Sequence, residues 1–348
     1  MNSPRWCATV ALLALWLSTS SSAQVAPDLH TVQVPVAAQG AADLQRAEAS
    51  ALRELAVRLS GRSDAASHAA IKAAATAPER YVQQYRYERN PAASADSTAP
   101  PWLVQLRFSP AAAAALLRDA GLPLWGPGRP ALQMWVVVDD GQTRRFVEAD
   151  DAAITMPLQQ QAQRRGVVIQ FPPSRAGVTE NAIAQLDAGA VVAAIRPAPG
   201  ELLLLGHLHN IGGSWRTRWR LAGAGQSGDA QADAGTVDEA VQVALDRLID
   251  GFAAQYAVAA VGAEEILQLR VIGIGSFDDY IALLRYVQEL SAVKSATPVL
   301  VAGDEVTLQL KAEVDVEQLR RQFALDARLA PVADAGPAQL QYRWSGQR

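Results

Sequence analysis

Three arginines occupy alternate positions of one short segment, at Arg216, Arg218 and Arg220. Alternate side chains of an extended strand point to the same face, so these guanidinium groups would lie side by side. A guanidinium binds phosphate and carboxylate oxygens through paired N–H donors, and this row could therefore hold an anionic ligand. The alternative is a solvent-exposed face whose arginines lie over aliphatic neighbours while Trp215 and Trp219 enter the core.

Two histidines, His207 and His209, lie two residues apart in a predicted strand and could ligate a metal ion together. A zinc site needs further ligands, and neither an H-E-x-x-H helix nor a carboxylate at a suitable spacing accompanies the pair. The other histidines are His30 and His68. The sequence therefore assigns no metal site, and we interpret the pair as polar residues at the end of a strand.

Acidic doublets are the third candidate for chemistry. They occur at residues 139–140, 150–151 and 278–279. Two carboxyl groups about 5 to 10 Å apart across a cleft could hydrolyse a glycan. Without a partnered base or a pocket, such doublets are typical of turns and helix caps.

Other catalytic patterns are missing or incomplete. Residues 273–278 (GIGSFD) resemble a phosphate-binding turn but lack the third glycine and the lysine of that pattern. The sequence has no Gly-x-Ser-x-Gly elbow for a nucleophilic serine. The sequence therefore assigns no catalytic residue and no cofactor, and it favours a binding protein over an enzyme.

An aromatic and basic group of residues gathers around position 85. It could form a partner-binding surface, although core packing on a helix is the favoured interpretation. Its members are Tyr81, Tyr85, Tyr87, Arg80, Arg86 and Arg89.

Composition narrows the function classes. The chain has 348 residues, a formal net charge of -4 and 19% charged residues, so it has no overall basic field to attract nucleic acid. Half of the residues are hydrophobic, which is enough to build packed cores, and the length suggests two or three domains. After residue 23, no apolar run reaches the roughly 18 to 20 residues of a membrane-spanning helix.

The first 23 residues have the pattern of a secretory signal peptide. Arg5 precedes an apolar run at residues 6–17, and small residues end at Ala23. Cleavage after Ala23 would remove Cys7, the only cysteine, and leave a chain without disulfides or a lipid-attachment thiol. We expect a periplasmic protein.

The remaining pattern predicts three domains of α/β and α+β class. The N-terminal α+β domain spans residues 28–124. Its expected strands lie at 30–36 and 102–108, and its helices at 43–59, 68–75 and 111–120, with another helix opening at Pro78 and carrying the three tyrosines.

The middle α/β domain spans residues 130–258 and is expected to hold a mixed sheet. Nearly continuous apolar runs at 132–138 and 202–207 are typical of strands covered on both faces. Trp215 to Leu221 alternates as a hairpin strand after the turn at 210–213. A capping box at Thr236 and Glu239 begins a long amphipathic helix.

The C-terminal domain spans residues 264–345. Its pattern is strand (266–274), helix (277–290), strand (292–301), strand (306–314), helix (316–329) and strand (339–344). This βαββαβ order predicts a ferredoxin-like domain.

A family resemblance rests on three segments and the strand that follows them. These segments are ALRELAVRLSGR at 51–62, RYVQQYRY at 80–87 and GLPLWG at 121–126 with Arg129 and Pro130. Together they resemble the bacterial family "domain of unknown function 2066" of exported proteins, over about residues 28–256. The resemblance implies an envelope protein of a Gram-negative bacterium and assigns no activity.

These observations predict an exported periplasmic protein that binds a protein partner or helps to assemble the cell envelope. Two alternatives remain open. One is an envelope hydrolase that uses paired carboxylates, and the other is a binder of an anionic envelope ligand through the arginine row.

Overall fold

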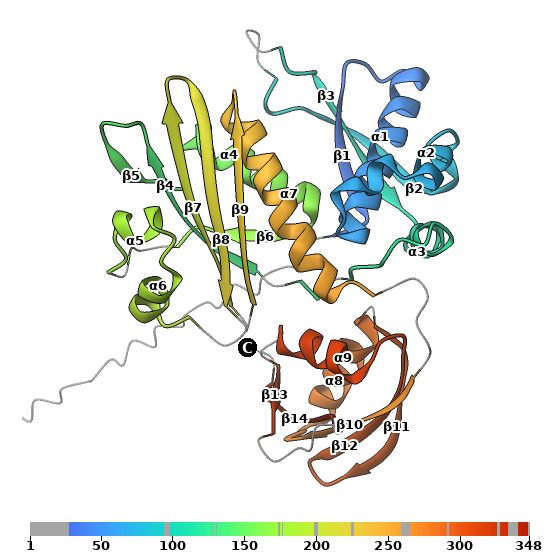
Figure 1. Cartoon of the computed structure of the whole chain (residues 1–348). Helices are drawn as coiled ribbons and strands as arrows, with labels where there is room; N and C mark the ends of the chain where they lie inside the picture. The colour runs from blue at the N-terminus through green and yellow to red at the C-terminus, as the bar shows by residue number, and fades with distance from the viewer. Residues whose placement is uncertain are drawn as a thin grey trace, which may run out of the picture.

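The computed structural model describes residues 28–93, 98–126, 128–129, 131–172, 175, 177–197, 201–223, 226–258, 265–290, 292–325, 328–332 and 340–346. The predicted signal peptide lies outside these residues. Three sheets, each with helices packed on it, make up the fold (Figure 1). The predicted mixture of α/β and α+β domains is confirmed.

The first domain is an antiparallel three-stranded sheet covered by helices. The strand order is β1-β3-β2, which leaves β1 and β2 as the two edges. Leu52 and Leu55 of α1 are buried in the same cluster as Val104 and Leu106 of β3, because the apolar stripe of the helix faces the sheet. The elements are β1 (Thr31–Val36), α1 (Ala41–Ser60), η1 (Ser63–Ser67), α2 (Ala69–Ala74), η2 (Pro78–Arg80), β2 (Val82–Arg89), β3 (Trp102–Phe108) and α3 (Pro110–Asp119).

The helix expected to open at Pro78 is wrong. Only a short 3₁₀ turn follows Pro78, and Val82–Arg89 forms strand β2 instead. Valine and tyrosine favour extended backbone, and the edge of β3 supplies the hydrogen-bond partners that the segment would lack alone. Tertiary pairing therefore decides the structure of this segment, and Tyr85 is 53% exposed rather than in the core.

The middle domain has three layers. Helices α4 and α7 cover one face of a mixed sheet, and α5 and α6 cover the other, so β4 and β7 are buried on both faces as predicted. Its sheet has the order β5-β4-β7-β8-β9, with β6 also paired to β4. The elements are β4 (Ala131–Asp139), β5 (Arg144–Phe146), α4 (Ala152–Arg165), β6 (Val168–Gln170), α5 (Glu180–Ala184), α6 (Ala188–Ile195), β7 (Leu202–Ile211), β8 (Ser214–Gly223), β9 (Gln226–Ala234) and α7 (Val237–Tyr256).

Local signals place the hairpin and the long helix correctly. The turn at Gly212 and Gly213 joins β7 to β8, and the Thr236 hydroxyl accepts a hydrogen bond from the Glu239 N–H at 3.2 Å. Strand β9 is not predicted by the sequence pattern, because Gln226–Ala234 holds no β-branched or aromatic residue. Pairing with β8 and cover by α7 stabilise it.

The C-terminal domain has the predicted ferredoxin-like topology. In its order β11-β12-β10-β14, the first strand β10 lies between β12 and β14 and pairs in parallel with β14, and a short β13 pairs with the other side of β14. The elements are β10 (Glu265–Ile272), α8 (Phe277–Glu289), β11 (Val293–Ala302), β12 (Glu305–Ala312), α9 (Val316–Ala324), β13 (Leu329–Pro331) and β14 (Leu340–Trp344).

The C-terminal domain contacts the end of α7. Gln322 of α9 donates to the Tyr256 carbonyl at 3.0 Å, and Gln318 donates to the Ala257 carbonyl at 3.0 Å. Leu124 and Val258 also form an isolated antiparallel bridge. Among the described helices, none is long and apolar enough to cross a membrane.

Candidate binding groove between the first two domains

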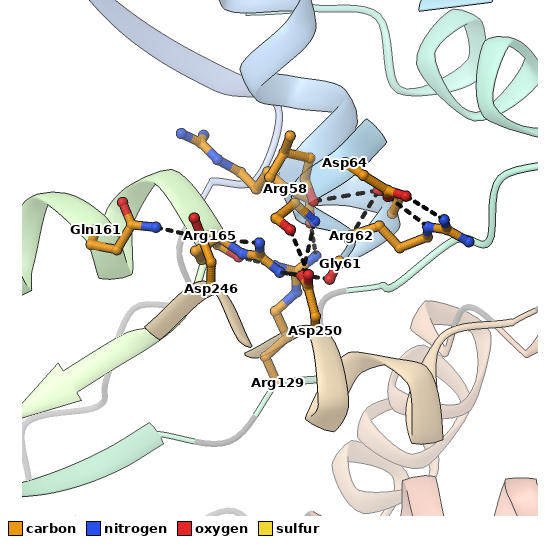
Figure 2. A network of polar contacts seen from close by, with 12 residues as sticks. Arg58, Gly61, Arg62, Asp64, Arg129, Gln161, Arg165, Asp246 and Asp250 are labelled. Atoms are coloured by element: carbon orange, nitrogen blue, oxygen red, sulfur yellow. Dashed lines mark hydrogen bonds and ion pairs between the residues drawn. The ribbon is translucent and has the colours of Figure 1, made fainter. Parts of the chain in front are cut away.

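Arg165 joins three elements of two domains. This last residue of α4 is only 1% exposed, and its guanidinium donates to the Asp246 carboxylate at 3.0 Å and the Asp250 carboxylate at 2.5 Å, both on α7. It also donates to the Gly61 carbonyl at the end of α1, at 2.6 Å (Figure 2). Asp250 in turn accepts from the Ser63 N–H at 2.8 Å. The first domain is therefore fixed to the middle domain by a charged network.

Arg129 is the second member of this network. Its guanidinium donates to five carbonyl oxygens, at distances between 2.6 and 3.2 Å, and stacks on the Trp125 ring at 3.9 Å. These carbonyls belong to Arg58, Trp125, Gly126, Arg165 and Gly166.

The carbonyls around Arg129 explain why a cation lies there. Several belong to the C-terminal ends of α1 and α4, where helix dipoles favour a positive charge. Burial, with the neighbouring charges of Arg58 and Arg165, lowers the pKa of Arg129 to about 9. The group is still protonated at neutral pH, so all five donors are in use.

Arg58 completes the cluster from α1. It is 3% exposed, pairs with Glu54 at 2.6 Å and donates to the Thr31 carbonyl of β1 at 2.7 Å. Its Nε also donates to the Arg164 carbonyl, at 3.4 Å. Burial lowers the pKa of Arg58, and Glu54 opposes this effect. We call Arg58, Arg129 and Arg165 the interdomain arginine cluster.

A groove of about 640 Å³ lies beside the interdomain arginine cluster. One wall belongs to β1, α1 and the segment after β2, and the other belongs to α4 and α7. The lining is rich in amide side chains, which can both donate and accept hydrogen bonds. Those amides are Gln33, Asn90, Gln160, Gln161, Gln163 and Gln242.

The free edge of β1 opens onto this groove. The Phe108 N–H donates to the His30 carbonyl, so even-numbered residues of β1 pair with β3 and odd-numbered residues face away from it. The Thr31 carbonyl is already bound by Arg58, and Pro35 has no N–H. Gln33 therefore offers the groove one backbone N–H and one carbonyl, and Pro35 offers a second carbonyl.

Two carboxyl groups of the groove have raised pKa values. Burial raises the pKa of Glu54 and of Asp246, although Arg58 and Arg165 respectively act in the opposite direction. Each carboxylate is held by its arginine, and Asp246 also accepts from Gln161 at 2.7 Å. These two acids, rather than the acidic doublets, line this groove.

The predicted arginine row lies elsewhere, on β8 of the middle domain. Arg216 pairs with Asp233 and Arg220 pairs with Asp229, both at 2.7 Å across to β9. Arg218 donates to the Ala184 carbonyl at 2.8 Å. The strand that the sequence analysis missed thus supplies carboxylates to two of the three arginines. Anion binding by this row stays a prediction.

The tryptophans beside the arginine row take different positions. Trp219 is fully buried, and Trp215 is partly buried and packs against the same core, as the alternative interpretation of this strand expected.

The two histidines stack on one another at the end of β7, with ring centroids 5.9 Å apart. Arg218 donates to Nδ1 of His207 at 2.9 Å, so the ring proton must lie on Nε2, which is 3.7 Å from the Asp139 carboxylate. Burial lowers the pKa of His207, and the charge of Arg218 adds to this effect. In the described residues, no three His, Cys, Asp or Glu side chains group as metal ligands.

The doublet at 139–140 forms a turn, whereas Asp151 precedes α4 without a side-chain capping hydrogen bond. Asp139 accepts from the Gly141 N–H and from Arg144, and Asp140 accepts from Thr143 and Gln142, so the pKa of each is lowered. Asp151 pairs with Arg145 at 2.7 Å.

The turn before α8 caps that helix. Ser276 accepts from the Asp279 N–H at 3.1 Å, and Asp279 accepts from the Trp344 indole. Ser276 and Trp344 lower the pKa of Asp279.

The interdomain arginine cluster is not predicted by the sequence pattern, because its members lie far apart in the chain. A weak signal was present. Asp246 and Asp250 lie four residues apart beside the apolar stripe of α7, and Arg165 directly precedes the helix-ending Gly166. Charged side chains beside a packed helix face indicate that another element packs there and supplies their hydrogen-bond partners.

The chain resembles one known family in its first domain. Residues 23–126 match the family described as Domain of unknown function (DUF8605). The match covers the first domain and ends three residues before Arg129. The middle and C-terminal domains lie beyond it.

This match corrects the resemblance to the family of domain of unknown function 2066, which was wrong, because the chain matches a different family and not that one. The segments at 51–62, 80–87 and 121–126 that carried the resemblance lie inside the matched range, whereas Arg129 and Pro130 lie beyond it. These segments form an amphipathic helix, an edge strand and the segment that follows a helix, and such patterns recur in unrelated folds. No curated protein matches the chain.

Proposed function

We propose that this protein is an exported, non-catalytic binding protein of the periplasm that holds an extended segment of a partner protein in the interdomain groove. The observation that carries the proposal is the free edge of β1 at Gln33 and Pro35, which faces a groove lined by amide side chains. The signal-peptide pattern of the first 23 residues supports export.

An extended peptide suits both walls of such a groove. Its backbone can add to the β1 edge, since Gln33 supplies a donor and an acceptor at the spacing of an antiparallel ladder. Its side chains and remaining backbone groups would meet Gln160, Gln163 and Gln242 on the opposite wall. Amides accept many partner groups, which favours recognition of backbone over recognition of one side chain.

The interdomain arginine cluster keeps this groove open in one shape. Arg165 is buried and bound on three sides, so the two walls are held in place before the ligand arrives. A pre-formed site binds more tightly, because less conformational entropy is lost on binding.

Photocrosslinking in the native envelope tests the proposal. A photoreactive side chain is placed at Gln160, at Gln242 or, as a control, at the exposed Gln268 of β10 in the C-terminal domain. We expect crosslinks from both groove positions to map within one short, extended segment of the same partner. Crosslinks that are absent, scattered or equally strong from Gln268 would reject the proposal.

A second candidate function is glycan hydrolysis, and one observation favours it. Glu54 and Asp246 line the same groove, and burial raises the pKa of each, as a general acid requires. Release of reducing ends from isolated envelope glycan tests this candidate. Activity that Glu54→Gln and Asp246→Asn abolish would support hydrolysis, whereas no release by the unaltered protein would reject it.

A further inference from the structure

Strand β2 presents an open edge on the side of the first domain opposite β1. Six of its eight residues, 84–89, pair regularly with β3, and the single register shift lies before Gln84. Since the sheet order is β1-β3-β2, the other side of β2 pairs with no strand of the described chain. Tyr85 is 53% exposed there and packs edge to face on Tyr87, with ring centroids 6.0 Å apart.

The hydrogen-bond pattern of β3 shows which groups of β2 are open. Phe108 donates to β1, so even-numbered residues of β3 face β1 and odd-numbered residues face β2. The Asn90 N–H donates to the Pro101 carbonyl, in agreement with this alternation. Even-numbered residues of β2 therefore pair with β3. The backbone groups of Tyr85, Tyr87 and Arg89 point to the open edge.

Three other sheet edges of the described chain are restricted, which limits strand addition. β1 keeps Gln33 as its residue with both a free N–H and a free carbonyl, because Pro35 has no N–H and Arg58 binds the Thr31 carbonyl. β11 contains Pro298 and two register shifts, and β13 is three residues long and ends at Pro331. In contrast, β2 contains no proline along its open edge. An edge left open in this way is available to another strand.

The charges on β2 identify which strand fits. Arg86 and Glu88 lie on one face of β2, two residues apart, and pair with each other at 2.9 Å. If a second β2 adds antiparallel about a two-fold axis at Tyr87, Arg86 lies opposite Glu88 of the second copy, and Glu88 lies opposite its Arg86. Tyr85 then lies opposite Arg89 of that copy, where a cation and a ring attract one another.

Neighbouring registers are excluded by the same charges. A two-fold axis at residue 86 would place Arg86 opposite Arg86, and an axis at residue 88 would place Glu88 opposite Glu88. Like charges directly opposite one another destabilise a sheet. We propose that two copies of this protein associate through β2 about an axis at Tyr87, forming one continuous six-stranded antiparallel sheet.

Charge exchange tests this register. In sedimentation velocity of the purified protein, we expect dimers that increase with concentration. Arg86→Glu or Glu88→Arg alone should weaken dimerisation about tenfold or more, because each places like charges opposite one another twice. The double variant Arg86→Glu with Glu88→Arg restores opposite charges and should restore the dimer.

The control is Arg53→Glu, which makes the same change of charge at an exposed position of α1 in the same domain. It should leave dimerisation unchanged. All variants should keep the melting temperature of the monomer, since these side chains are exposed. A protein that is monomeric at every concentration, or a double variant no better than the single ones, would overturn the proposal.

Discussion

Two groups of three arginines occupy opposite sides of the middle domain and are used in opposite ways. The arginines of β8 occupy alternate positions of one strand at the surface, and two of the three pair with aspartates of β9. The interdomain arginine cluster comes from α1, the linker and α4, and it binds carbonyls and carboxylates of two domains.

The difference lies in what surrounds each guanidinium. Arg216 keeps 52% of its side chain exposed, so water screens its ion pair, whereas Arg165 keeps 1%. A buried charge without its partners costs far more than an exposed one. We infer that the β8 row can be altered at little cost, while the interdomain arginine cluster determines whether the first two domains stay together.

The largest expected effect comes from Arg165→Met. This change keeps the aliphatic stem but leaves two carboxylates and the Gly61 carbonyl without their partner, at a cost of about 3–5 kcal/mol. Arg216→Met is the matched control and should cost about 0–1 kcal/mol. Urea denaturation followed by tryptophan fluorescence measures both. Equal losses would show that the two groups do not differ.

A smaller effect is expected from Gly61→Ala, compared with Gly121→Ala. Both glycines follow a helix with left-handed backbone, at φ +70° and φ +67°, so both substitutions carry a strain of about 1–2 kcal/mol. A Cβ at Gly61 would also lie 2.3 Å from the Ala253 Cβ of α7, whereas one at Gly121 meets nothing within 4 Å.

The difference between these two variants isolates the interdomain contact. We expect Gly61→Ala to lose about 1–3 kcal/mol more in the same urea experiment, the usual cost of overpacking. Similar losses in the two variants would mean that α1 and α7 separate without cost.

The smallest expected effect is a pH dependence of stability that arises from His207, whose ring accepts a hydrogen bond from Arg218 of the β8 row. Because the pKa of His207 is lowered below 6.5, the unfolded chain binds this proton more readily than the folded protein does. The stability associated with neutral His207 is therefore lost as the pH falls below about 6.5 towards the folded pKa. The melting temperature of the unaltered protein should fall faster between pH 7 and pH 5 than that of His207→Gln. Parallel curves would contradict this expectation.

Much of the fold follows from local sequence patterns. The ferredoxin-like topology and the buried strands β4 and β7 were predicted, because caps, glycine turns and apolar runs are local signals. Strands β2 and β9 were not, because each depends on a neighbouring strand rather than on its own residues. For the same reason, the tyrosines near residue 85 were assigned to a helix.

The candidate site was much harder to predict. Thr31 and Arg58 are 27 positions apart and meet only when α1 packs on the first sheet, and Gly61 and Arg165 are 104 positions apart and meet only when the two domains pack. Regular spacing drew attention to Arg216, Arg218 and Arg220, although spacing along one strand reports a shared face and not a ligand. The network that shapes the groove is visible only in three dimensions.

The most direct test of the groove uses two substitutions of Gln33 with the photoreactive group at Gln242. Gln33→Pro removes the backbone N–H at the free edge of β1 without removing a bond to β3, and Gln33→Val removes only the side-chain amide. We expect the crosslink to the partner to be lost in Gln33→Pro and kept in Gln33→Val. A crosslink that is kept in Gln33→Pro, or lost equally in both variants, would contradict it.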